Sequence, residues 1–169
     1  MSSSCKRFFP FALWLLAATV SAAEPQAINL EITSYLGDGQ TFTEGDEISF
    51  MLSLDQPAYI YLFYQDATNQ LTQILPNPKQ PENYYQPGQF IPVPDPKAGF
   101  KFIVQAPFGE EKLWAFASDS KIDFLNSKAP SDSRSLTSYS INKIREYFRR
   151  LSSTIYDEDV TIMKTSTYQ

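Results

Sequence analysis

The sequence contains no histidine and a single cysteine, Cys5, and these two absences exclude several classes of active site. Without histidine, neither a Ser-His-Asp triad nor a Cys-His pair can form, and zinc sites with imidazole ligands are excluded as well. A glycine-rich phosphate loop is also missing, because Gly37-Asp38-Gly39 lacks the required spacing and the helix that should follow it. The sequence therefore predicts no bound cofactor and no catalytic or metal site of these kinds.

The start of the chain, residues 1–22, has the pattern of a secretory signal peptide. Lys6 and Arg7 give it a positive charge, an apolar run follows them, and small residues at Ala22 and Ala23 form a cleavage site. The apolar core of this segment is only about half the roughly 20 residues that a membrane-spanning helix needs. We therefore expect cleavage, no stable membrane span, and a periplasmic or secreted protein.

The chain is acidic, with a formal net charge of −5 from 14 basic and 19 acidic residues. Loss of the leader would make the domain more acidic by two charges and would also remove Cys5, which leaves no disulfide and no metal-thiolate site. An acidic domain repels nucleic acid and anionic membrane surfaces, so we expect no nucleic-acid partner. Without disulfides, stability must come from core packing.

Residues 27–169 are expected to form one domain made mainly of β-strands, organised around a hairpin at 58–76. Both faces of Tyr59–Tyr64 are apolar, which predicts an interior strand, and Gln70–Leu75 returns after a turn at Asp66–Asn69. Residues 118–138 read as a polar connection. Alternation of side chains predicts further strands at 27–36, 47–54, 100–105 and 159–165, and residues 89–93 could pair as an edge strand. Residues 112–118 are apolar on both faces, which predicts a second interior strand.

One amphipathic helix is expected at residues 140–151. Ile141, Ile144, Phe148 and Leu151 recur at helical spacing and form an apolar stripe, which we expect to cover the second face of the hairpin strand. Short strands separated by turns are typical of a β-sandwich. The predicted fold is therefore an immunoglobulin-like antiparallel β-sandwich with one C-terminal helix and a final strand.

Two segments carry candidate interaction residues. Seven prolines make residues 76–96 a long loop, and aromatic rings with polar edges, such as those in this loop, are common in binding surfaces. Arginines beside Lys143 give the helix a basic face, which either faces solvent or docks an acidic partner. The tyrosines of long loops also often fold back onto the core, so Tyr84 and Tyr85 could cap the core instead of forming a binding surface. The candidates are Asn77, Asn83, Tyr84, Tyr85, Phe90, Arg145, Arg149 and Arg150.

Two groups of acidic residues are candidates for chemistry. Glu110 and Glu111 would have to converge to act as a carboxylate pair in glycoside hydrolysis, whereas neighbours on an extended segment point apart. The run Asp157-Glu158-Asp159 lacks the twelve-residue calcium loop with its alternating acids and glycine. We therefore expect no metal at this run and interpret it as a solvated turn.

Six short motifs follow one another along the chain: Gly45–Phe50, Ala58–Phe63, Leu75–Asn77, Gln86–Gly88, Val93–Asp95 and Pro107–Gly109. In this order they resemble a bacterial family of uncharacterised domains, domain of unknown function four-three-eight-four. The resemblance covers residues 43–118 and implies an immunoglobulin-like sandwich with no assigned catalytic residues. Members of that family often lie beside kinase-like, caspase-like or repeat modules in larger surface and envelope proteins.

These expectations favour a non-catalytic, exported accessory domain for interaction or assembly in the bacterial envelope or in a secretion-type apparatus. Its partners would be envelope proteins, whose identity and stoichiometry the sequence does not give. The alternative is a cell-wall protein that binds carbohydrate or processes glycan with carboxylates.

Overall fold

The computed structural model describes residues 27–37, 39–126, 140–151 and 155–168. The expected leader and the second half of the polar connection lie outside the described residues. As predicted, the described part is mainly β, with strands β1 to β11 and helices α1 (Asp123–Asn126) and α2 (Ile141–Arg150). No helix among the described residues is long and apolar enough to cross a membrane.

Most strands belong to two sheets. The central sheet has the strand order β2 (Thr41–Thr43), β11 (Tyr156–Ser166), β10 (Glu110–Ser118), β5 (Ala58–Gln65) and β6 (Leu71–Leu75). The outer sheet has the order β1 (Leu30–Ser34), β4 (Phe50–Leu54) and β8 (Ile91–Val93). A ribbon pairs β3 (Glu47–Ile48) with β9 (Phe102–Ile103), and β7 (Tyr84–Tyr85) pairs with β5. All of these pairings are antiparallel except that of β2 with β11.

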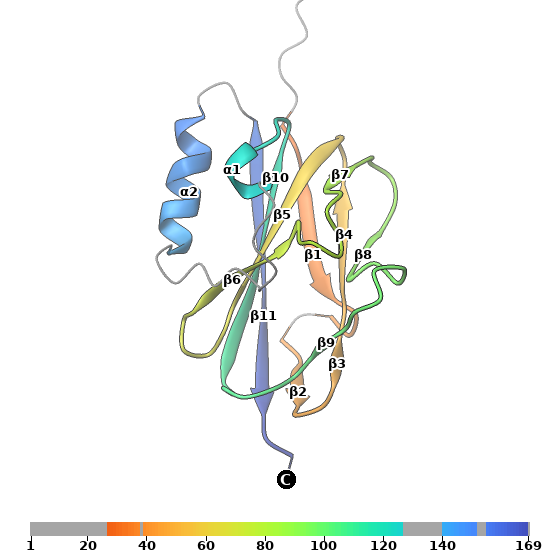
Figure 1. The fold of residues 1–169 in the computed structure, drawn as a ribbon, viewed down its shortest axis with the longest axis vertical. Helices are drawn as coiled ribbons and strands as arrows, with labels where there is room; N and C mark the ends of the chain where they lie inside the picture. Colours follow the sequence, from red (N-terminus) through yellow and green to blue (C-terminus); the bar gives the residue numbers. More distant parts are fainter. Residues whose placement is uncertain (1–26, 38, 127–139, 152–154, 169) are drawn as a thin grey trace, which may run out of the picture.

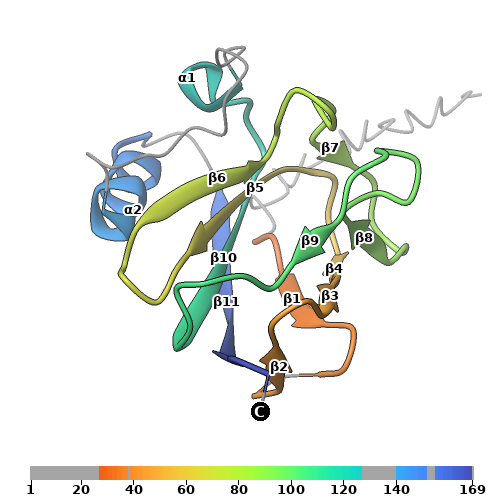
Figure 2. The same ribbon diagram turned by 60° about the horizontal axis from the view of Figure 1, so that its bottom comes forward.

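The elements form three layers (Figure 1). The outer sheet lies on one side of the central sheet, and α2 lies on the other. Figure 2 shows the same arrangement with the lower end turned forward, where β3 and β9 lie. The central sheet is therefore covered on both faces, and this explains why its inner strands β5 and β10 are apolar on both faces.

The core between the two sheets consists mainly of aliphatic side chains. Alternate residues of β5 and β10, such as Ile60, Leu62 and Leu113, are fully buried there and face Leu52 of the outer sheet. Each such side chain contributes roughly 1.5 to 3 kcal/mol of stability on burial. Because side chains alternate along a strand, every second residue of β5 and β10 points into this core.

The core beneath α2 consists mainly of aromatic side chains. The Phe148 ring of α2 stacks on Phe116 at a centroid distance of 4.9 Å and meets Tyr61 edge to face at 5.9 Å. Phe63 packs against Phe116 in the same cluster, which also holds Ile144. This confirms that the helix stripe covers the second face of the hairpin strand.

The turn between β5 and β6 is made by the residues that the sequence indicated. Asp66 Oδ1 accepts hydrogen bonds from the backbone N–H groups of Thr68, at 2.9 Å, and Gln70, at 2.8 Å. Asn69 has a positive φ of 65°, a conformation that asparagine tolerates better than most residues. Side-chain and backbone preferences therefore agree at this turn.

Several segments differ from the prediction, and the strand expected at 47–54 is divided into β3 and β4, which belong to different sheets. The expected strand at 100–105 shrinks to the two residues of β9, because Val104 bonds to the turn at Gly45-Asp46 instead of to a sheet. β7 was not predicted, since it lies between prolines. The described part of the polar connection contains α1, and its Ile122 and Leu125 are buried in the core beneath α2.

Candidate functional site

The proline-rich loop, residues 76–96, is fastened by its own amide side chains. Asn77 Oδ1 accepts hydrogen bonds from the backbone N–H groups of Lys79 and Gln80, at 2.8 and 2.9 Å. The buried Gln80 accepts one from the backbone N–H of Asp95, at 3.1 Å, and donates one to the Tyr85 hydroxyl, at 3.2 Å. The hydrogen bond between Gln80 and Asp95 thereby joins the two ends of the loop. Asn77 bonds to the backbone of the loop itself.

Asn83 is buried and does not belong to an exposed surface, which corrects the sequence interpretation. Its carbonyl accepts a hydrogen bond from the Ile60 N–H at 2.7 Å, and its Nδ2 donates one to the Ile60 carbonyl at 3.0 Å. The amide side chain imitates a backbone partner and extends the pairing of β7 with β5. A buried backbone group needs such a partner, so Asn83 has a structural task.

The loop aromatics divide between the core and the surface. Tyr85 packs against the core between the sheets, and burial raises the pKa of its hydroxyl. Tyr84 is about half exposed, with its ring 4.8 Å from that of Tyr59. Phe90, just before β8, is 74% exposed. Of the predicted loop residues, Tyr84 and Phe90 therefore offer apolar surface to a partner.

Arg145 attaches α2 to the central sheet. Its Nε donates to both carboxylate oxygens of Glu158 on β11, at 2.8 and 2.9 Å, and its guanidinium lies 4.6 Å from the centre of the Trp114 ring on β10. Both members of the ion pair are partly buried, with 25% and 29% of their side chains exposed. The sequence interpretation placed Arg145 on a free basic face, whereas the structure shows it in a contact between layers.

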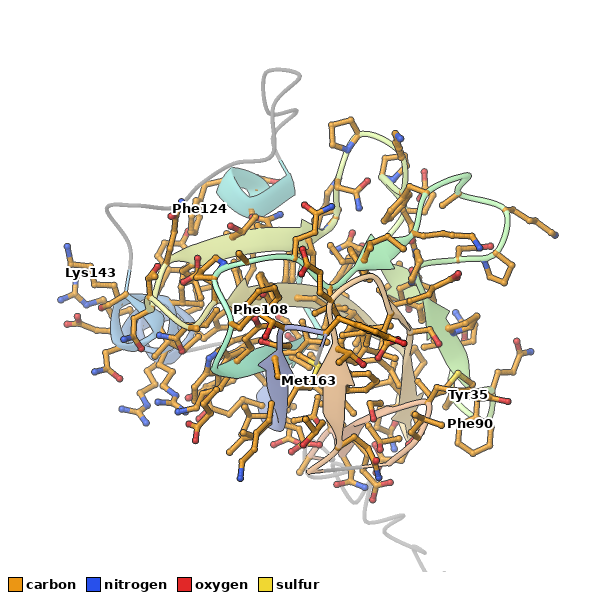
Figure 3. All side chains as sticks on the ribbon, turned by 90° about the horizontal axis from the view of Figure 1, so that it is seen from below. Tyr35, Phe90, Phe108, Phe124, Lys143 and Met163 are labelled. Carbon is orange, nitrogen blue, oxygen red and sulfur yellow. The ribbon has the colours of Figure 1, made fainter. Side chains whose placement is uncertain are left out.

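The other helix arginines also have partners on the protein itself. Arg149 donates to the Tyr156 hydroxyl at 3.3 Å, and Arg150 pairs with Glu146 one helical turn earlier at 2.5 Å. Figure 3 shows Lys143 of α2 on the side of the molecule opposite Phe90. The structure therefore does not bring the loop candidates and the helix candidates together in one surface.

The acidic run Asp157-Glu158-Asp159 lies inside β11 and is not a solvated turn. Asp157 and Asp159 point towards the outer sheet, where they accept the N–H groups of Leu30, at 2.9 Å, and Ile32, at 2.8 Å. Glu158 points to the opposite side and binds the helix, as described above. No cluster of three metal-ligating side chains occurs in the part of the chain that the structure describes.

Glu110 and Glu111 point apart, as expected for neighbours on a strand. Glu110 is exposed and forms an ion pair with Lys112 at 3.1 Å, whereas Glu111 is 3% exposed and faces the core between the sheets. The sequence interpretation missed this burial. The signal was present, because Glu111 alternates with Leu113 and Ala115 on the inward face of β10.

Comparison with known protein families confirms the resemblance inferred from the motifs. Residues 41–121 match the family model of a domain of unknown function (DUF4384), which spans the chain from β2 to the end of β10 and just beyond. No curated protein and no solved structure matches the chain.

Proposed function

We propose that this protein is an exported, non-catalytic domain that holds a protein partner in the bacterial envelope and thereby assists the assembly of an envelope or secretion-type apparatus. Its fold is an immunoglobulin-like sandwich to which a C-terminal helix and a final strand are added. The proposal draws on the leader pattern of residues 1–22, the DUF4384 match and the exposed aromatic residues of the loop at 76–96.

Phe90 is the observation that carries the proposal. A phenylalanine exposed to this extent loses contact with water when a partner covers it, and aromatic anchors of this kind contribute much of the energy of protein interfaces. The loop around it is already held by Gln80 and Asn83, so binding would order little additional backbone. An exposed ring on a fixed loop suits recognition.

The test is affinity purification from envelope extracts of the source bacterium with the full chain as bait. We expect a defined protein to co-purify with the unaltered chain and to be lost with Phe90→Ser. Tyr168→Ser is the matched control, because Tyr168 is an equally exposed aromatic residue outside the loop. Loss of the partner with both variants, or with neither, would contradict a role for the loop.

A carbohydrate-binding or glycan-processing role is the second candidate, and the ring of Tyr84 beside Tyr59 favours it. The two neighbouring rings are inclined to each other by 49°, and a sugar could stack on the half-exposed ring of Tyr84. Retention of the protein on purified peptidoglycan, abolished by Tyr84→Ala and unaffected by Phe90→Ser, would support this alternative over the protein partner.

A further inference from the structure

A cleft of about 470 Å³ opens between the central sheet and the segment that carries β9. Its apolar wall includes Ile48, Ile74, Val104 and Met163. Met163 lies near the middle of the molecule in Figure 3, where the lower end faces the viewer. The volume falls within the range of roughly 300 to 1,000 Å³ that is typical of small-ligand sites. No residue of the loop at 76–96 lines this cleft.

The cleft contains a buried carboxylate. Glu111 lines it and accepts a hydrogen bond from the Thr165 hydroxyl at 2.8 Å. Tyr64 lies beside it, and both burial and the hydrogen bond to Glu111 raise the pKa of the Tyr64 hydroxyl. None of the ion pairs among the described residues includes Glu111. A buried glutamate is rare without a positive partner, so this one is unusual.

The other groups of the cleft also favour a positive charge. Asp66 contributes a second carboxylate, and the Nζ of Lys101 is held 2.6 Å from Glu47. The rings of Phe50 and Phe102 line the same space, and aromatic rings can attract cations. Low-dielectric walls strengthen the field of a carboxylate inside a cleft. A purely apolar or anionic ligand would leave Glu111 without a counter-charge.

We propose that this cleft binds an ammonium group on an unbranched apolar stem, with the ammonium at Glu111 and the stem along the apolar wall. The group belongs either to a small alkylamine or to the lysine side chain of another protein. This site is separate from the loop surface described above, so each proposal can fail without the other.

The test is a titration followed by methyl NMR, with hexylammonium, 1-hexanol and hexanoate as probes of equal stem length. We expect hexylammonium to shift the methyl signals of Ile74 and Met163 at millimolar concentrations, and hexanoate to leave them unchanged. Glu111→Gln should weaken hexylammonium binding by about 10- to 100-fold, the factor equivalent to a hydrogen bond with a charged group. Glu110→Gln is the matched control and should bind normally.

A second variant keeps the proposal testable if Glu111→Gln does not fold. Ile74→Trp leaves Glu111 in place but adds a large ring to the cleft wall, so it should abolish the shifts at Met163, whereas Ile74→Val should preserve them. Equal binding of 1-hexanol and hexylammonium, or normal binding by Glu111→Gln, would overturn the proposal. Titration with Nα-acetyl-lysine N-methylamide, whose side-chain ammonium is free, identifies the source, since only a site for lysine side chains tolerates its bulky backbone end.

Discussion

The two faces of the central sheet are built from different side chains. Towards the outer sheet, β5 and β10 present aliphatic residues such as Leu62 and Leu113, whereas towards α2 they present rings such as Tyr61 and Phe116. The cover differs too, since the outer sheet lies over one face, whereas α2 lies over the other together with the short α1 segment. The same two strands thus serve two unlike cores.

The difference follows from the shape of each cover. Two sheets pack about 10 Å apart over a broad area, and branched aliphatic side chains from both faces fill that space evenly. One helix touches only a strip of the sheet, so fewer residues must bury more area each. Rings do this, since a buried aromatic side chain covers about 150 to 250 Å². Phe148 is accordingly in contact with Phe116, Tyr61 and Tyr156.

The largest expected effect comes from Phe148→Ala, which removes the centre of the aromatic core. We expect a loss of about 3 to 5 kcal/mol in the free energy of unfolding, measured by urea denaturation. Hydrogen exchange should show α2 losing protection while β4 keeps most of its own, because the core between the sheets remains intact. Equal loss of protection in both elements would show that the two cores unfold as one.

Leu52→Ala applies the same change to the aliphatic core. Leu52 is fully buried on β4, and we expect a loss of about 2 to 5 kcal/mol in the same denaturation experiment. Protection should fall in β4 and also in α2, because the helix rests on a sheet that the outer sheet supports. Retained protection in α2 while β4 loses its own would contradict this dependence of the helix on the outer sheet.

The stability of the protein at alkaline pH tests the environment of Tyr64, which faces the core between the sheets. Its pKa is raised above the ordinary value of 10.0, so the neutral hydroxyl stabilises the fold. That contribution is complete below pH 10 and is lost as pH rises further, at up to about 1.4 kcal/mol per pH unit. Tyr64→Phe should therefore show a shallower decline between pH 10 and 11 in urea denaturation. An unchanged slope would contradict the raised pKa.

The smallest effect is expected for Arg145→Met, which keeps the apolar stem but removes the charge that binds α2 to β10 and β11. The ion pair with Glu158 and the contact with Trp114 should together contribute about 1 kcal/mol, because both are partly exposed to solvent. Arg150→Met is the control, and its exposed pair with Glu146 should cost no more than about 0.5 kcal/mol. Equal costs would place Arg145 on a free helix surface, as the sequence first indicated.

Residue alternation was sufficient to predict the strands that carry both cores. Ile60 and Leu62 alternate with Tyr61 and Phe63, and each set is buried on the expected side. The hairpin turn could also be predicted from the sequence, because Asp66 bonds to backbone groups only a few residues away and Asn69 adopts a positive φ itself. Both features depend on local sequence, which a single chain displays directly.

Contacts between distant segments could not be predicted. Asp157 bonds to Leu30, 127 residues earlier, and Asn83 bonds to Ile60, 23 residues earlier. In a sequence, an acidic or amide side chain that bonds to water looks the same as one that bonds to a remote backbone group. The candidate surface was predicted only in part for this reason, since Phe90 is exposed while Asn83 and Arg145 are engaged inside the fold.

The carboxylates of Asp157 and Asp159 also have a consequence for self-association. A sheet edge with unused donors is a template on which another chain can add a strand and start aggregation. On β1 the outward N–H groups of Leu30 and Ile32 are already taken by these carboxylates, and at the opposite edge β8 carries Pro92, which has no N–H. Both margins of the outer sheet are thus shielded from strand addition, and Asp157→Ala with Asp159→Ala would open one of them.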